Sequence, residues 1–230
     1  MNENKSRARD KLWYLKRIHL SLPKYSLGEE IFSAVVHGVS TLFAVFILVF
    51  LLIVSEKNAL NITSVCIYGT SMILLYVAST MYHALNINKA KKVFQILDHC
   101  AIFLLIAGTY TPITLVAIGG VKGIVLFSVV WAAGILGIVL NAVDLKKYSK
   151  FSMVCYITMG WIIVVLFKDF VASTTYFATL YLIIGGICYT VGAIVYGFGK
   201  KIKYMHSIWH LFVLAGSACH FVTVFEIIKK

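Results

Sequence analysis

The run IFSAVVHGVSTLFAVFILVFLLIV, residues 31–54, decides the fold class because it holds no Asp, Glu, Lys or Arg over its whole length. A helix needs about 20 apolar residues to cross about 30 Å of hydrocarbon, and this run is longer than that. The composition agrees: 60% of the residues are hydrophobic, 13% are charged, and the mean hydropathy is +0.90. Soluble domains carry about 25% charged residues. The chain is therefore expected to be an integral membrane protein.

Six further apolar runs follow the first one, separated by short polar connections. We predict an all-α membrane protein, a seven-transmembrane helix bundle, with helices near 31–54, 63–85, 97–117, 122–142, 149–168, 175–196 and 206–228. Residues 1–30 form a basic segment before a seven-transmembrane domain at 31–230. Within that segment, residues 11–22 (KLWYLKRIHLSL) alternate apolar and basic side chains at helical spacing, which favours an interfacial helix over a disordered tail.

Basic residues alternate along the chain and set the orientation. Lys and Arg number seven before the first run, then one, three, one, three, one and three in successive connections, and two at the end. By the positive-inside rule the N-terminus is cytoplasmic and the C-terminus extracytoplasmic. We expect a multi-pass protein of the cell membrane, a bacterial plasma membrane, whose net charge of +12 faces anionic lipids.

The distribution of basic residues also indicates which partners to expect. Basic loops beside anionic lipid account for the charge, so no nucleic acid is expected, and membrane lipids are the natural partners. The sequence indicates no obligate protein partner and leaves an oligomer open. The five cysteines fall singly in five apolar runs, which argues against a disulfide framework or a thiolate metal site.

Imidazole and acidic side chains near the cytoplasmic ends of several helices are the candidate site, because ionisable groups in a membrane are costly. His206 and His210 are four residues apart, so they share one helix face at the spacing that helical zinc sites use. His83 ends the second predicted helix at the same depth. Three histidines leave one position for water, and Asp98, expected to open the third helix, could serve as its base. Ser79 lies one turn from His83, although a hydrogen bond between helices explains it equally well.

Depth along the helices distinguishes the other polar residues. Glu30 lies in the same layer, either at the edge of the cavity or as a plain boundary charge, and His37 lies about 10 Å further in with its role open. His220 lies about 15 Å from His210 along its helix, too far to share a metal. His99 points about 100° away from Asp98 and is expected either to lie at the membrane interface or to pack.

Four short patterns together resemble the hemolysin III family, within the progestin and adipoQ receptor superfamily. They are E-x6-H at Glu30 to His37, S-x3-H at Ser79 to His83, Asp98, and H-x3-H at His206 to His210. The pattern is also similar to that of alkaline ceramidases. The resemblance implies a seven-helix fold and a zinc ion held by His83, His206 and His210, with Asp98 and Ser79 as catalytic residues beside it.

The expected activity is a zinc-dependent hydrolysis of lipid amide or ester bonds, with Asp98 as general base. A second hypothesis is a non-catalytic membrane-lipid sensor in which zinc joins two helices. The third is the cytolytic, pore-forming activity that the family name suggests, although the helices show no polar stripe suited to a wide channel. Fold resemblance alone does not choose between them.

Overall fold

The structure is a computed structural model that describes residues 20–199 and 202–229, and within these ranges the secondary structure is entirely helical. The elements in chain order are α2 (Leu27–Val54), α3 (Ala59–Ala84), α4 (Lys89–Pro112), η1 (Ile113–Ile118), α5 (Gly120–Trp161), η2 (Ile162–Leu166), α6 (Phe167–Ser173), α7 (Tyr176–Phe198) and α8 (Met205–Ile228). The interfacial helix expected at 11–22 lies almost entirely outside the described residues.

Within the described ranges, six helices are long and apolar enough to cross a membrane. Their surface pattern is the reverse of that of a soluble protein. On α2, Leu42 and Phe46 are 71% and 62% exposed, whereas Ser33, His37 and Ser40 are buried. Apolar side chains thus face the surroundings and polar ones face the bundle, as expected when lipid is the solvent. The chain is a multi-pass membrane protein.

Polar capping residues start the helices earlier than hydropathy predicts. Ser26 forms a capping box with Glu29 at the start of α2, and Asn58 and Asn88 accept backbone N–H groups at the starts of α3 and α4. The first turns are too polar for hydropathy to register. The expectation that Asp98 opens its helix is therefore wrong: α4 begins at Lys89, and Asp98 lies about 13 Å further along it.

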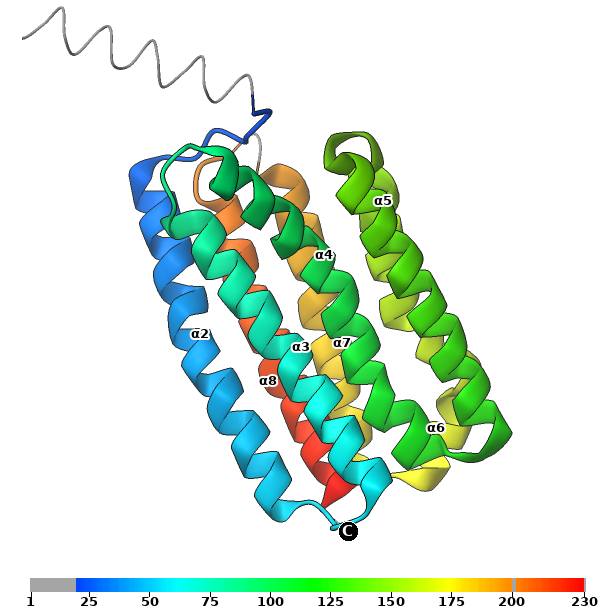
Figure 1. Ribbon diagram of the computed structural model, residues 1–230. Helices are drawn as coiled ribbons and strands as arrows, with labels where there is room; N and C mark the ends of the chain where they lie inside the picture. The colour runs from blue at the N-terminus through cyan, green and yellow to red at the C-terminus, as the bar shows by residue number, and fades with distance from the viewer. Residues whose placement is uncertain (1–19, 200–201, 230) are drawn as a thin grey trace, which may run out of the picture.

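The long helix α5 reverses direction at Asp144, whose φ of −155° and ψ of 91° are not helical. Asp144 Oδ1 accepts the backbone N–H of Lys147, so the acid caps the helix that follows. Ser152 Oγ donates to Asn141 Oδ1 at 2.6 Å, although the two would lie about 16 Å apart on a straight helix. α5 therefore has two antiparallel arms, 120–143 and 145–161, and Figure 1 shows the reversal between them.

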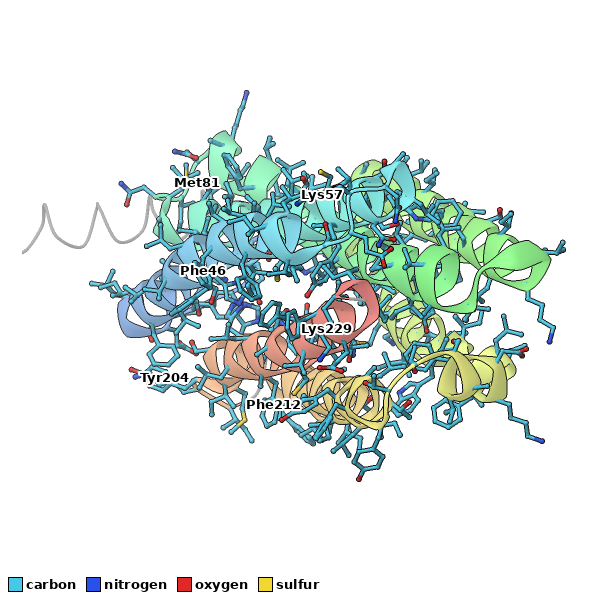
Figure 2. All side chains as sticks on the ribbon, turned by 90° about the horizontal axis from the view of Figure 1, so that it is seen from below. Phe46, Lys57, Met81, Tyr204, Phe212 and Lys229 are labelled. Carbon is cyan, nitrogen blue, oxygen red and sulfur yellow. The ribbon has the colours of Figure 1, made fainter. Side chains whose placement is uncertain are left out.

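The helices form a bundle in which α8 lies between α2 and α7, and α3 lies between α2 and α4 (Figure 1). A view along the bundle shows α8 beside both neighbours, with side chains radiating outward (Figure 2). We call the end where α2, α4 and α8 begin and α3 ends the histidine end, and the other the opposite end. After Pro112 the backbone widens into the π-helix η1, and Gly119 and Gly120, both with positive φ, make the turn into α5.

Candidate metal centre

Three imidazoles meet at the histidine end of the bundle. His83 ends α3, and His206 and His210 lie one turn apart at the start of α8. His83 Nε2 lies 3.3 Å from His206 Nε2 and 3.2 Å from His210 Nε2, and the ligand atoms of all three lie within 4.8 Å of one another. All three side chains are almost completely buried.

This spacing fits a metal ion. In a tetrahedral site with metal–nitrogen distances of about 2.0–2.1 Å, two ligand nitrogens lie about 3.3 Å apart. Imidazole nitrogens are common ligands of zinc and of other transition metals. His83, His206 and His210 could therefore hold a metal ion by three Nε2 atoms, as the sequence spacing suggested.

Two residues of α2 orient these ligands. Glu30 Oε2 accepts a hydrogen bond from His83 Nδ1 at 2.8 Å, which leaves the lone pair of His83 on Nε2, toward the cluster. His37 Nε2 lies 3.0 Å from His210 Nδ1. When His210 binds a metal through Nε2, its Nδ1–H donates to His37. Helix α2 thus contributes a hydrogen-bond partner to His83 on α3 and another to His210 on α8.

Lys91, which hydropathy and motif spacing in the sequence do not single out, completes this arrangement. Its Nζ lies 3.0 Å from Glu30 Oε1 and also donates to the backbone carbonyls of Tyr82 and Leu85, at the end of α3. Lys91 is only 2% exposed. The Lys91 ammonium thus balances the charge of the Glu30 carboxylate that accepts from His83. A signal existed in the sequence, since Lys91, Gln95 and Asp98 recur at helical spacing and all three are buried on one face of α4.

The start of α8 is fixed against α2 by polar contacts. Tyr204, with a positive φ of 67°, donates its backbone N–H to Glu29 Oε1 at 2.8 Å. Ser207 Oγ lies 3.1 Å from Ser33 Oγ and 3.3 Å from the carbonyl oxygen of Glu29. These contacts set the height of α8 and therefore the position of His206.

Tyr25, just before α2, covers the cluster. Its ring stacks on that of His206 with centroids 4.5 Å apart and lies 5.9 Å from that of His83. Burial raises the pKa of the Tyr25 phenol well above its ordinary value, and the nearby Tyr82 and Tyr196 add to the shift. Tyr25 therefore stays neutral and separates the imidazoles from the surface.

A cavity of about 120 Å³ extends from the imidazoles into the bundle between α4, α5, α7 and α8. Its lining on α4 runs from Asp98 to Ile113, about 22 Å along the helix, and is mostly apolar. Asp98 lines the same cavity as His206 and His210 but is not part of the three-histidine cluster. Ser79 is buried beside the Asp98 carboxyl, yet its hydroxyl makes no hydrogen bond of normal geometry to a described residue.

His99 also lines the cavity, whereas the sequence predicts an interfacial or packing position for it. Its Nδ1 donates to the backbone carbonyl of Gln95 at 2.9 Å, and its Nε2 lies 3.4 Å from the hydroxyl of Tyr196. Asp98 Oδ2 lies 3.8 Å from His99 Nδ1. His220 lies deeper in the bundle, with Nε2 3.3 Å from the carbonyl oxygen of Leu182, and it is not part of the cluster.

These features define a class: a multi-pass helical membrane protein with a buried three-histidine centre that adjoins an apolar cavity. The family described as Haemolysin-III related matches residues 25–221, and the chain belongs to this haemolysin III family. It is 41% identical over 198 residues to "Hemolysin-3" of Bacillus cereus, covering 85% of this chain and 90% of that protein. It is 41% identical over 202 residues to "Hemolysin-3 homolog" of Bacillus subtilis (strain 168), covering 87% of this chain and 94% of that one.

A more distant similarity joins the chain to a human protein. It is 25% identical over 173 residues to "Monocyte to macrophage differentiation factor" of Homo sapiens, covering 71% of this chain and 70% of that protein. This relative belongs to the progestin and adipoQ receptor superfamily. Membership in the haemolysin III family and the apolar helices together place the protein in the cell membrane.

Proposed function

We propose that the protein is a zinc-dependent hydrolase of lipid amide or ester bonds. The observation that carries the proposal is that His83 Nε2 lies 3.3 Å from His206 Nε2 and 3.2 Å from His210 Nε2, the spacing of ligands in a tetrahedral site, and that His206 and His210 line an apolar cavity. A zinc ion in such a site lowers the pKa of a water molecule and polarises a carbonyl group. A lipid amide or ester offers both a scissile carbonyl and an apolar chain.

Different residues of the chain would bind the lipid chain, transfer the proton and stabilise the developing negative charge. The apolar side chains along α4 would hold an acyl chain, with its carbonyl at the imidazoles. An Asp98 Oδ atom would take the proton of the attacking water and then deliver it to the leaving nitrogen or oxygen. The Ser79 hydroxyl, beside Asp98, would donate to the carbonyl oxygen as negative charge develops on it. Membrane lipids are the partners that this assignment requires.

The topology that we propose has seven crossings. Both arms of the α5 region, residues 120–143 and 145–173, exceed the about 30 Å of the hydrocarbon core at 1.5 Å per residue. With the other five helices they make seven spans. An odd number of spans places the two termini on opposite sides, with the N-terminus cytoplasmic by the distribution of basic residues. The histidine end then faces the cytoplasm.

The test compares Asp98→Asn with wild type, both purified with zinc and supplied with fluorescent ceramides and lipid esters. We expect the variant to keep its zinc content and thermal stability and to lose at least about 100-fold in turnover, since proton transfer by a positioned side chain contributes about 10² to 10⁴. His206→Ala combined with His210→Ala should lose the metal as well. Hydrolysis that continues at the wild-type rate in both variants would refute the proposal.

A structural role for zinc is the second candidate, favoured by the way the centre joins helices. Ligands come from α3 and α8, and α2 contributes a partner to His83 and another to His210. A lipid sensor with such a clamp would lose thermal stability on metal removal and would consume no lipid in any assay. The name of the Bacillus cereus relative suggests a third candidate, cytolysis, which dye release from liposomes containing the purified protein would reveal.

A further inference from the structure

The three imidazoles of the candidate metal centre are enclosed on their helical sides. The ring of Tyr82 packs against that of His83 with centroids 4.5 Å apart, and the ring of Tyr196 lies 5.7 Å from that of His206. The cavity that approaches the centre from inside the bundle has mostly apolar walls. A hydrated cation is strongly disfavoured in apolar surroundings. A metal ion therefore has to arrive from the histidine end, which the proposed topology places at the cytoplasmic face.

At the histidine end, residues 20–25 precede α2, and we call this segment the lid. Tyr25 is its contact with the centre, since its ring stacks on that of His206 with centroids 4.5 Å apart and 21° between the ring planes. The Tyr25 side chain is partly exposed, whereas His206 is only 3% exposed. The phenol ring is therefore the layer that separates this imidazole from the surroundings.

Two side chains attach the lid to the bundle. Leu22 is buried, at 8% exposed, and Tyr25 stacks on His206, whereas Lys24 between them is exposed. Within the described ranges, residues 20–25 make no hydrogen bond to the helices. A segment held by a few side-chain contacts, without backbone hydrogen bonds to the rest of the fold, opens locally at a small cost in free energy.

The lid ends at a residue that is firmly held. Ser26 donates its backbone N–H and its hydroxyl to Glu29 Oε2, each at 2.7 Å. The other oxygen of the same carboxylate, Glu29 Oε1, accepts the backbone N–H of Tyr204 just before α8. Ser26 is therefore tied to the starts of both α2 and α8. The lid can move about Ser26 while His206 keeps its position on α8.

We propose that residues 20–25 form a lid for metal exchange, which lifts about Ser26 and takes the Tyr25 ring off His206 when a metal ion enters or leaves the centre. Because the same contact must open in both directions, the lid sets the rate of exchange and not the affinity for the metal. This inference rests on the proposed metal centre. It does not depend on the hydrolase activity and holds equally for a lipid sensor.

Zinc exchange of the full chain in lipid nanodiscs tests the lid. Release is followed by absorbance after zinc-loaded protein is mixed with an excess of a chromophoric chelator, and uptake after metal-free protein is mixed with zinc. We expect Tyr25→Ala to speed both about tenfold, the factor that loss of one stacked aromatic contact gives. The ratio of the two rate constants, which is the dissociation constant, should stay close to the wild-type value. A residue that only supported His206 as a ligand would instead change this ratio.

Three further substitutions sharpen the result. Tyr25→Phe keeps the ring and should exchange zinc at the wild-type rate. Leu22→Ala loosens the second attachment and should speed release and uptake severalfold, which keeps the test decisive if Tyr25→Ala fails to fold. Leu27→Ala is the matched control, because Leu27 is close to the lid in the chain but 76% exposed. It should leave both rates unchanged.

The outcomes separate the lid from the proposed function. Wild-type rates in both Tyr25→Ala and Leu22→Ala would overturn the lid, and so would faster release without faster uptake. A wild-type protein that binds no zinc would overturn the lid and the hydrolase together. If the rates change as expected but no lipid is hydrolysed, the lid stands and the hydrolase does not.

Discussion

The ion pair between Glu30 and Lys91 has two roles that a set of substitutions can separate. It balances two buried charges, with side chains 12% and 3% exposed and Nζ 3.0 Å from Oε1. It also holds the carboxylate that orients His83, with Oε2 2.8 Å from Nδ1. The first role concerns stability and the second concerns metal affinity. The variants are Glu30→Gln, Lys91→Met and the two combined.

Glu30→Gln leaves Lys91 as a buried charge without its counter-ion. Breaking a buried pair in this way costs about 3 kcal/mol, which for a chain of this size lowers Tm by about 6 to 12 °C. In the double variant both charges are gone, and the stability should return to within about 1 kcal/mol of wild type, because a neutral buried pair carries no such penalty. Zinc affinity should behave differently. It should fall about 10- to 100-fold in both variants, since each lacks the carboxylate that orients His83.

The assays are thermal unfolding of the metal-free proteins in detergent and zinc titration against a chromophoric chelator. Glu56→Gln is the control, because Glu56 is an exposed acid at the opposite end of the bundle. It should change neither property. If the double variant binds zinc as tightly as wild type, Glu30 does not orient a metal ligand, and our account of the centre is wrong. If Glu30→Gln has the wild-type Tm, the two charges are not buried against each other.

Three further predictions follow from the structure. Asn141→Leu should lower stability by about 1 to 3 kcal/mol, measured as a fall in Tm, because it leaves the buried hydroxyl of Ser152 without its acceptor; an unchanged Tm would contradict the reversal in α5. In intact cells, a cysteine replacing Lys57 should react with an impermeant maleimide and one replacing Lys147 should not, because seven spans place them on opposite sides; equal labelling would contradict the topology. Removing metal from the wild-type protein with EDTA should lower its Tm and adding zinc should restore it, whereas indifference to both would argue against a bound metal.

The sequence predicts the helical membrane fold well because hydropathy records the energy of burial in lipid, residue by residue. It predicts the ends of the helices less well. The capping residues Asn58 and Asn88 start two helices several residues before hydropathy rises, which moves Asp98 away from a helix start. The histidine spacing on α8 is readable because a helix repeats every 3.6 residues. The charge pair that orients His83 is not readable, because Lys91 looks like an ordinary boundary charge in the sequence.

What the sequence alone determined is the set of apolar helices, the family resemblance and the candidate ligands His83, His206 and His210, all of which depend on local pattern. The tertiary structure decided how these residues meet. It brought Lys91 to Glu30 and Glu30 to His83, and it placed Tyr25 over His206. The physical reason is that such contacts join residues far apart in the chain. They depend on the heights and rotations of helices, which packing sets and no local pattern encodes.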